Sequence, residues 1–322
     1  MGAACMISVY APAQAEKLTE LGRMRVEILE QSWSRFRESS ELNRVNACAG
    51  SGPMVVSADM LTLVWHMKRA WEITGGLFDP TMLSEIKAAG YDADYASVIA
   101  RGALAGIASW NQEAVSGAEG TSAIPTTRVS FMNDVNIDLE ASTISLPAGV
   151  GLDPGAIGKG LGADIVAHEL MEAGASGVLV DLGGDIVVAG KPGDADAWVI
   201  AIEDERDPNN AAREPQLVTC NTRSTNDEHE TFGIATSSTL YRRWAGGTRH
   251  HVIDPRTGKM ADPDLIQATV WCGAGWLAEV TATAAMLMKP DAACAWLTTH
   301  DAGYTVMTPT QMWSSLEKVQ HG

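Results

Sequence analysis

Apolar residues recur every three or four positions in several stretches of the chain, which is the pattern of amphipathic α-helices. One stretch ends at Thr74-Gly75-Gly76, and glycine after the last apolar position is a typical helix stop. A shorter helix is predicted after Ser39 or Ser40, because either serine can cap its first turn. On its own, that pattern is typical of a capped surface helix. The longer predicted helices cover residues 15–34, 58–74, about 156–173 and 276–288.

Short apolar runs lie between these helices and predict β-strands. Gly183 and Gly184 interrupt one run, which indicates a bulge or a place where another group approaches the backbone closely. Because helices and strands are mixed without strict β-α-β alternation, the sequence predicts an α+β fold of mixed sheets with packed helices. The predicted strands lie in residues 1–10, 128–146, 177–190, 198–202 and 267–272. The 198–202 strand is expected to pair antiparallel with the 177–190 run.

The length of 322 residues allows one large domain or two closely associated ones. We expect a single domain over residues 1–322, built as two interlocked lobes. Residues about 92–130 lack periodicity and are rich in Ala, Gly and Ser, which predicts a variable connection with room for one short helix. Residues about 203–230 are polar and predict an exposed loop or insertion.

The chain has a formal net charge of −17, with 46% hydrophobic and 20% charged residues, a composition typical of globular proteins. Such a charge repels phosphate at long range and argues against nucleic acid or an anionic membrane as a partner. No apolar run approaches the ~20 residues needed to cross a membrane, so no membrane insertion is expected. An anionic cofactor would need a locally positive pocket or a bound cation.

Residues 1–18 contain neither a basic n-region nor a long apolar h-region, so we expect no signal peptide and a cytoplasmic location. An exported parent whose leader had been removed would leave the same sequence. The five cysteines are widely scattered and form no Cys-x-x-Cys or Cys/His cluster. This pattern argues against zinc and favours free thiols in a reducing compartment.

The stretch Gly151–Gly160 places a carboxylate, Asp153, and an amine, Lys159, in a glycine-rich turn that opens a predicted helix. Free backbone N–H groups and the positive end of the helix dipole suit a phosphate, and Lys159 would add a full charge. The alternative is an ordinary helix start in which Lys159 is a solvated surface charge.

Three further segments carry candidate chemistry. The rigid turn at 77–81 sets an aromatic ring, a carboxylate and a hydroxyl after two glycines, either as a plain turn or as the lining of a small-molecule site. Residues 250 and 251 are adjacent histidines, which are either structural or, because histidine has an ordinary pKa of ~6.5, able to accept a proton near neutrality. Glu279 and Thr283 share one face of an apolar helix, where a hard cation would satisfy both. The alternative there is an exposed Glu279 and a Thr283 hydroxyl bonded to the preceding turn.

Eight sequence blocks occur in the order found in the ApbE family, the FAD:protein FMN transferases. They span nearly the whole chain, which therefore resembles this family. The blocks are Met1-Gly2, SRFRESSELNRVN (34–46), TGGLFDPT (74–81), LDPGAIGKG (152–160), LVDLGGDI (179–186), IATSS (234–238), HHVIDPRTG (250–258) and LAEVTAT (277–283).

The resemblance implies a site for FAD and a divalent metal, normally Mg²⁺, between the two lobes. It implies that the backbone carbonyl of Ala156 holds the metal together with Glu279 and Thr283, and that His251 is the catalytic general base. The implied FAD contacts are Met1, Phe36, Leu77, Phe78, Asp79, Asp153, Lys159 and Val252.

Several positions depart from the family pattern. Phe36 stands where many members carry Tyr, so its ring can stack but cannot donate a hydrogen bond. Glu279 replaces the Asp ligand, and its extra methylene moves the carboxylate outward, so a shifted metal or a displaced helix is expected because Mg²⁺ tolerates little distortion. The remaining departures are Pro154 for Leu, Gly158 for the second Ala, and Ser238 for Gly.

The implied reaction is a metal-dependent transfer of FMN from FAD to a Thr hydroxyl of a target protein, with release of AMP. Two alternative functions remain open. One is a metal-dependent FAD pyrophosphatase giving FMN and AMP, in which water replaces the Thr. The other is a non-catalytic FAD-binding or carrier protein. The expected partners are FAD and a Thr-bearing target flavoprotein.

Overall fold

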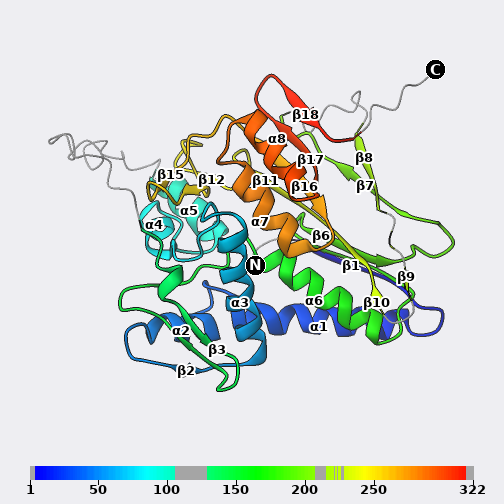
Figure 1. Cartoon of the computed structure of the whole chain (residues 1–322), viewed down its shortest axis with the longest axis horizontal. Helices are drawn as coiled ribbons and strands as arrows, with labels where there is room; N and C mark the ends of the chain where they lie inside the picture. Colours follow the sequence, from blue (N-terminus) through cyan, green and yellow to red (C-terminus); the bar gives the residue numbers. More distant parts are fainter. Residues whose placement is uncertain are drawn as a thin grey trace.

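The computed structural model describes residues 4–105, 129–206, 215–220, 222, 224–225 and 228–316 (Figure 1). Its centre is a seven-stranded antiparallel sheet in the order β1-β5-β6-β11-β16-β17-β18. The strands of this sheet are β1 (Cys5–Tyr10), β5 (Gly177–Leu182), β6 (Ile186–Gly190), β11 (Thr231–Ser238), β16 (Gln267–Cys272), β17 (Gly303–Met307) and β18 (Met312–Ser314).

Eight α-helices occur in the described residues, and they confirm the prediction of an α+β fold. They are α1 (Ala15–Trp33), α2 (Glu41–Ala47), α3 (Ala58–Ile73), α4 (Leu83–Ala88), α5 (Tyr95–Ala105), α6 (Gly158–Glu172), α7 (Gly275–Ala285) and α8 (Pro290–Thr299). In this part of the chain, none is long and apolar enough to span a membrane.

Smaller strand groups surround the main sheet. A three-stranded sheet is formed by β2 (Met54–Val55), β4 (Thr143–Ser145) and β3 (Asn136–Asp138). The paired strands are β7 (Trp198–Ile202) with β8 (Gln216–Cys220), β9 (Ser224–Thr225) with β10 (Glu228–His229), β12 (Arg243–Trp244) with β13 (Arg249–His250), and β14 (Ile253–Asp254) with β15 (Lys259–Met260).

The central sheet is apolar on both faces because side chains alternate along each strand. Val178 and Val180 of β5 belong to the large core that α1, α3 and α6 complete, whereas Leu179 packs into a separate core with β7 and β8. On the helical side, Arg25 of α1 forms hydrogen bonds with Glu169 of α6 at 2.8 Å and with Asp59 of α3 at 2.6 Å. This half-buried ion network links α1 to α6, which lies beside it below β1, and to the upright helix α3 (Figure 1).

Most elements lie where the hydrophobic pattern predicts them. The structure confirms the long helices to within a few residues and the β16 strand at its predicted bounds. Ser40 caps α2, since its hydroxyl accepts the N–H of Asn43 at 3.1 Å. The 128–146 stretch contains the antiparallel pair β3 and β4, as predicted for a hairpin. The variable connection contains α5, and residues 106–128 lie outside the described residues.

Two strand predictions were wrong in detail. Gly183 and Gly184 are not a bulge inside one strand; they form the turn between β5 and β6, both with positive φ, and they line the cavity described below. The 198–202 strand pairs with β8 rather than with the run before it, because residues 216–220 of the predicted loop are a strand. An exposed loop was therefore the wrong assignment for that part of 203–230.

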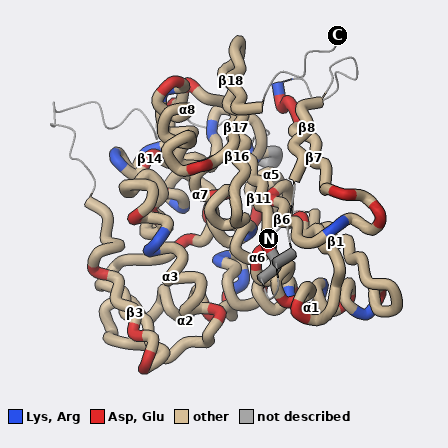
Figure 2. Tube along the Cα trace, turned by 45° about the vertical axis from the view of Figure 1, so that its right-hand side comes forward, with Lys and Arg blue, Asp and Glu red and all other residues tan. Residues whose placement is uncertain are grey.

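Charged positions of both signs are interspersed along the described trace (Figure 2). The excess of Asp and Glu over Lys and Arg, which gives the net charge of −17, is therefore spread over the molecule rather than gathered in one segment. A ligand that carries negative charge meets repulsion from many directions and depends on local groups to offset it.

Helices α6 and α7 cross at an unusually close contact between glycine backbones. A Cβ atom added to Gly160 would lie 2.3 Å from the carbonyl oxygen of Gly275. Asp164 of α6 also binds the start of α7, because its carboxylate accepts the N–H groups of Gly275 at 2.7 Å and Trp276 at 2.8 Å. These contacts fix the distance between the two helices, and α7 in turn packs on β11 and β16.

We predict that Gly160→Ala lowers the free energy of unfolding by ~1–3 kcal/mol, since the new methyl group must push α6 away from α7. The measurement is the urea midpoint of unfolding. Gly102→Ala in α5 is the matched control, because a Cβ there meets no atom within 4 Å and alanine favours a helix interior. Equal midpoints for Gly160→Ala and the unaltered protein would contradict the close crossing.

Candidate active site

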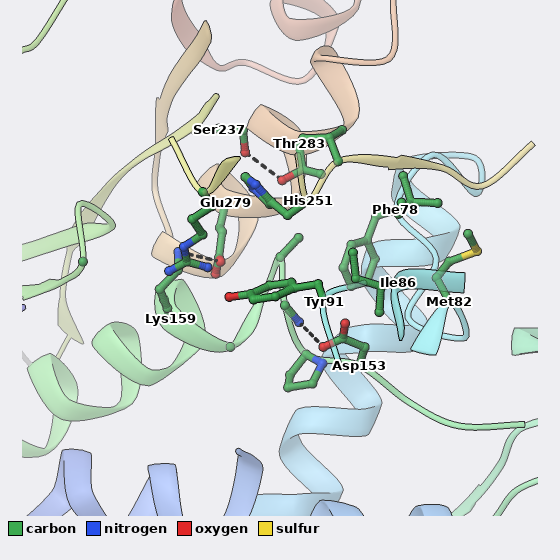
Figure 3. Close-up of a pocket in the computed structure, with 18 of the residues that line it drawn as sticks. Phe78, Met82, Ile86, Tyr91, Asp153, Lys159, Ser237, His251, Glu279 and Thr283 are labelled. Atoms are coloured by element: carbon green, nitrogen blue, oxygen red, sulfur yellow. Dashed lines mark hydrogen bonds and ion pairs between the residues drawn. The ribbon is translucent and has the colours of Figure 1, made fainter. Parts of the chain in front are cut away.

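A cavity of about 470 Å³ opens beside the start of α6 and one face of α7 (Figure 3). Its walls come from both parts of the molecule, the central sheet with its helices and the segments around α2, α4 and β12–β14. The lining residues lie in the stretches 33–36, 77–86, 153–159, 183–184, 203–205, 236–242, 251–255 and 279–283, together with Glu30 and Tyr91.

A buried ion cluster lies at one end of this cavity. The Nζ atom of Lys159 forms an ion pair with the carboxylate of Asp185 and lies 2.9 Å from Oε1 of Glu279 (Figure 3). The second oxygen of Glu279 accepts the N–H of Gly160 at 2.8 Å. Both carboxylates are almost fully buried, at 1% and 3% exposure. Two carboxylates thus share one ammonium group, and the cluster keeps an excess negative charge if all three groups are ionised.

This cluster decides between the alternatives for Lys159 and Glu279. Neither a solvated Lys159 nor an exposed Glu279 is observed. The expectation of free N–H groups at the start of α6 is wrong for Gly160, whose amide is already bonded to a carboxylate. The first turn of α6 does attract an anion, but in this structure the anion is the side chain of Glu279.

Two hydroxyl groups lie beside the ion cluster. Thr283 follows Glu279 by one turn of α7, and its hydroxyl is 2.8 Å from that of Ser237 on β11 (Figure 3). The alternative in which Thr283 bonds to the preceding turn is therefore wrong. Ala156, in the turn before α6, lines the same cavity. In residues 4–105 and the other described ranges, no group of three or more His, Cys, Asp and Glu side chains is placed to hold a metal.

His251 lies between β13 and β14 and faces the cavity (Figure 3). Its Nδ1 atom is buried and has no hydrogen-bond partner among the described residues. Burial lowers the pKa of His251 to about 3, and the charges of Arg242, His250 and Lys159 act in the same direction. The ring is therefore neutral at physiological pH, which leaves a nitrogen lone pair available to accept a proton.

An aromatic and cationic wall forms the opposite side. The guanidinium of Arg35 lies over the rings of Phe36 and Tyr91, at 4.2 and 4.6 Å from their centroids, and 3.4 Å from Asp153. The Tyr91 ring also stacks on Trp244 at a centroid distance of 5.5 Å. These contacts hold an apolar surface beside the cavity without leaving the buried guanidinium uncompensated.

Side-chain amides of α2 hold two of the lining segments in place. Asn43 donates to the carbonyl oxygens of Arg35 at 3.0 Å and Arg37 at 2.9 Å. Asn46 bonds to both backbone groups of Leu152, at 2.7 and 3.0 Å, directly before Asp153. Helix α2, which the sequence pattern predicted as a surface helix, therefore holds the 34–37 turn and the 152–153 segment in position through these hydrogen bonds.

The turn at 77–81 is held by its own polar groups. The carboxylate of Asp79 accepts the N–H and the hydroxyl of Thr81 at 2.9 and 2.6 Å, and the N–H of Phe78 bonds to the hydroxyl of Thr74 at 3.0 Å. The residues of the turn that line the cavity are Leu77, Phe78 and Asp79. The segment is thus both a rigid turn and part of the cavity wall.

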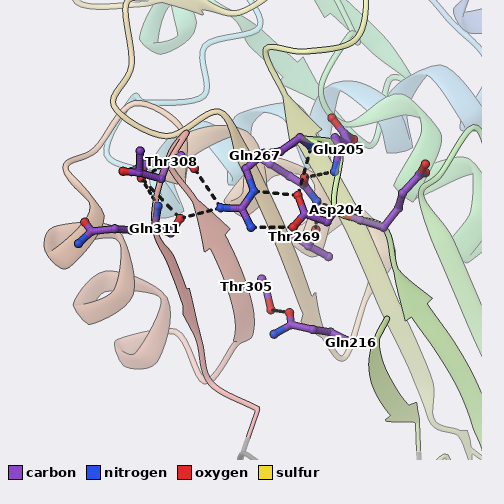
Figure 4. Close-up of polar contacts among 11 residues, drawn as sticks. Asp204, Glu205, Gln216, Gln267, Thr269, Thr305, Thr308 and Gln311 are labelled. Atoms are coloured by element: carbon purple, nitrogen blue, oxygen red, sulfur yellow. Dashed lines mark hydrogen bonds and ion pairs between the residues drawn. The ribbon is translucent and has the colours of Figure 1, made fainter. Parts of the chain in front are cut away.

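The short acidic segment 203–205 after β7 forms another edge of the cavity, and hydrogen bonds with Gln267 and Arg206 hold it in place (Figure 4). The amide of Gln267 accepts the N–H of Glu205 at 3.0 Å and donates to the carbonyl of Glu203 at 2.7 Å. Arg206 binds Asp204 through two nitrogens, at 2.8 and 2.6 Å. Burial raises the pKa of Glu205 to about 7. The polar run predicted as a loop thus begins with an ordered cavity edge.

The structure gathers all but one of the residues predicted for the site. Met1 lies outside the described residues. The others line the one cavity: Phe36, Leu77, Phe78, Asp79, Asp153, Ala156, Lys159, His251, Val252, Glu279 and Thr283. Sequence reasoning did not single out several other lining residues, among them Arg35, Tyr91, Glu205 and Arg242. Arg35 lies inside one of the sequence blocks, Tyr91 directly precedes the variable connection, and Glu205 lies in the polar run predicted as a loop.

Two named proteins are similar in sequence along most of this chain. FAD:protein FMN transferase of Treponema pallidum is 28% identical over 310 residues, which are 92% of this chain and 79% of that protein. The Vibrio cholerae protein of the same name is 29% identical over 278 residues, 85% of this chain and 73% of that protein.

Solved structures share the fold. The flavin transferase ApbE from Vibrio cholerae superposes with a TM-score of 0.71 at 23% identity, and the ApbE protein from Thermotoga maritima with a TM-score of 0.74 at 19% identity. Each match covers 98% of this chain and 94% of the other. The family model described as the ApbE family matches residues 1–308. The chain therefore belongs to the ApbE family.

Proposed function

We propose that this protein is an FAD:protein FMN transferase that joins FMN to a Thr hydroxyl of a target protein and releases AMP. The observation that carries the proposal is that one cavity combines a neutral histidine, a buried lysine–carboxylate cluster and an aromatic wall. The names of the similar proteins from Treponema pallidum and Vibrio cholerae support the same reaction.

The apolar wall fits the flavin and adenine rings of FAD. Phe36, Phe78 and Tyr91 supply aromatic surface, and Leu77 packs with Val252 on a neighbouring part of the lining. Flat apolar rings gain free energy by leaving water for such a surface, and a stacked arrangement fixes their orientation. The diphosphate between the two ring systems must then lie where polar groups gather, toward Lys159 and His251.

The polar end of the cavity fits a divalent cation. The lysine cluster carries one more carboxylate than ammonium group, and hydroxyl oxygens of Thr283 and Ser237 lie beside it. Hard cations prefer oxygen ligands, and Mg²⁺ is commonly held by few carboxylates together with waters and phosphates. Glu279, Thr283 and the Ala156 carbonyl would hold it. Bound there, the cation would stabilise negative charge on the diphosphate as its bridging bond breaks.

The chain's own residues then act on the acceptor. His251 accepts the proton of the Thr hydroxyl, and the oxygen forms a bond to the phosphorus on the FMN side of the diphosphate. The bond between that phosphorus and the bridging oxygen breaks, and AMP leaves with the bonding electron pair. A pKa of about 3 makes the ring a weak base, but a nearby diphosphate anion raises the pKa of a histidine.

Incubation of the protein with FAD, Mg²⁺ and a Thr-bearing acceptor tests the whole proposal. We expect AMP release together with a mass increase of the acceptor equal to FMN less one water. An acceptor in which the target Thr is replaced by Val is the control and should gain no mass. AMP and free FMN without a mass gain would indicate a pyrophosphatase, and intact FAD would indicate a carrier protein.

We expect His251→Ala to lower the rate of AMP release by ~10²–10⁴, because loss of a general base removes that much acceleration. FAD binding, followed by flavin fluorescence, should be largely retained. His168→Ala on the exposed face of α6 is the control. If His251→Ala also loses FAD binding, then His251 positions the substrate and is not the base.

Thr283→Val tests the cation site, because it replaces a hydroxyl by a methyl group of similar size. We expect the Mg²⁺ concentration for half-maximal AMP release to rise ~10-fold or more. Thr281→Val is the matched control on the same helix, since Thr281 is buried and bonds to the carbonyl of Leu277 at 2.6 Å. An equal Mg²⁺ requirement in both variants would remove Thr283 from the cation site.

A further inference from the structure

Arg242 is a cavity-lining cation that sequence analysis gave no role. We propose that its guanidinium binds the diphosphate of FAD and is the main cationic contact that this chain itself offers to that group. The inference rests on the proposed function. Four observations support it: the ion pairs of the other cavity cations, the absence of a partner for Arg242 among the described residues, its backbone conformation and its electrostatic effect on the cavity walls.

The other two cations of the cavity lining are already neutralised by carboxylates. Lys159 is bonded to Asp185 and Glu279, and Arg35 lies against Asp153 and two aromatic rings. A charge engaged by buried carboxylates offers little further attraction to an arriving anion, because its field is largely cancelled at short range. The diphosphate therefore requires another positive group in a cavity where carboxylates outnumber cations.

Arg242 has no such engagement. It forms no hydrogen bond and no ion pair with any residue that the structure describes, although it lines the cavity and is half-buried. By contrast, Arg206 binds Asp204 and Arg256 binds Asp254 through two nitrogens each. A guanidinium can bind phosphate oxygens through two parallel N–H groups, and an unengaged one can do so without first breaking an ion pair.

The backbone at Arg242 points to the same role. Its φ is +49°, in the left-handed region that glycine adopts freely and other residues adopt at an energetic cost. The neighbouring Ala245 shares this conformation, with φ of +52°. Backbone strain of this kind collects at functional sites, where it holds a side chain in a position that an unstrained turn would not give.

The charge of Arg242 affects the pKa of two cavity-lining side chains, His251 and Tyr91. Burial is the main cause of the low pKa of His251, and the charge of Arg242 is the next largest. Burial raises the pKa of Tyr91, and Arg242 is the main opposing influence. Coulomb effects weaken with distance and are screened by salt over about 8–10 Å, so the guanidinium lies near both side chains. A phosphate near His251 would therefore also be near Arg242.

Binding measurements on three variants test the proposal without relying on turnover. Arg242→Gln removes the charge, Arg242→Lys keeps a charge without the planar fork, and Arg242→Gly removes the charge while suiting the left-handed backbone. Arg243→Gln is the matched control, because Arg243 is the exposed neighbour on β12 and does not line the cavity. FAD and riboflavin are titrated with each protein by flavin fluorescence, with a chelator present to keep FAD intact.

We expect the Kd for FAD to rise about 10-fold or more in Arg242→Gln and Arg242→Gly, since a charged hydrogen bond to phosphate is lost. Arg242→Lys should lie between these variants and the unaltered protein. Riboflavin, which has no phosphate, should bind all of them equally well. The thermal midpoint of Arg242→Gly should be no lower than that of the unaltered protein, which excludes misfolding as the cause.

Three outcomes would overturn the proposal: an unchanged Kd for FAD in Arg242→Gln, an equal loss of riboflavin binding, or the same loss in Arg243→Gln. Each of them leaves the proposed function standing if the unaltered protein still releases AMP and modifies an acceptor. The experiment also separates the opposite case, in which the transferase proposal fails and the Arg242 proposal holds. If the unaltered protein binds FAD but never splits it, the transferase proposal fails, and the comparison of Arg242 variants still decides the role of this residue.

Discussion

The close crossing of α6 and α7 is the contact on which the polar end of the cavity depends. Only a hydrogen atom at Gly160 lets the backbone of α6 approach that of Gly275, and this approach brings Lys159 and Glu279 within hydrogen-bonding distance. Asp164 holds the first turn of α7 against α6 from the same side. The two helices pack on the central sheet, so the sheet, through them, sets the position of the charged groups.

The wall opposite these helices has a different physical basis. Its ion pair, Arg35 with Asp153, is enclosed by aromatic rings rather than by helix backbones, and the amides of α2 hold the two segments that carry it. The cavity is therefore bounded by two independent rigid units. Lys159 and Arg35 offset part of the carboxylate charge in these clusters, and the lysine cluster keeps one carboxylate in excess.

The elements with strong periodicity were predictable from the sequence, because burial of one face imposes the spacing directly; α3 and β16 are examples. The site blocks were also predictable, since their residues combine unusual chemistry with fixed turns. Tyr91, Glu205 and Arg242 were not, because they reach the cavity from segments whose course depends on distant contacts. Glu205 is placed by Gln267, and Tyr91 packs on Trp244, far away in sequence in both cases.

The hydrogen bond between Glu279 and the amide of Gly160 changes how ligand binding at this end should be understood. A side-chain carboxylate already occupies the place where a helix N-terminus attracts an anion. An incoming phosphate that uses this amide must therefore exchange with an internal anion rather than enter a vacant position. In an exchange of this kind the number of hydrogen bonds is nearly conserved, so affinity depends on where the displaced carboxylate goes. A cation that accepts Glu279 would make the exchange favourable.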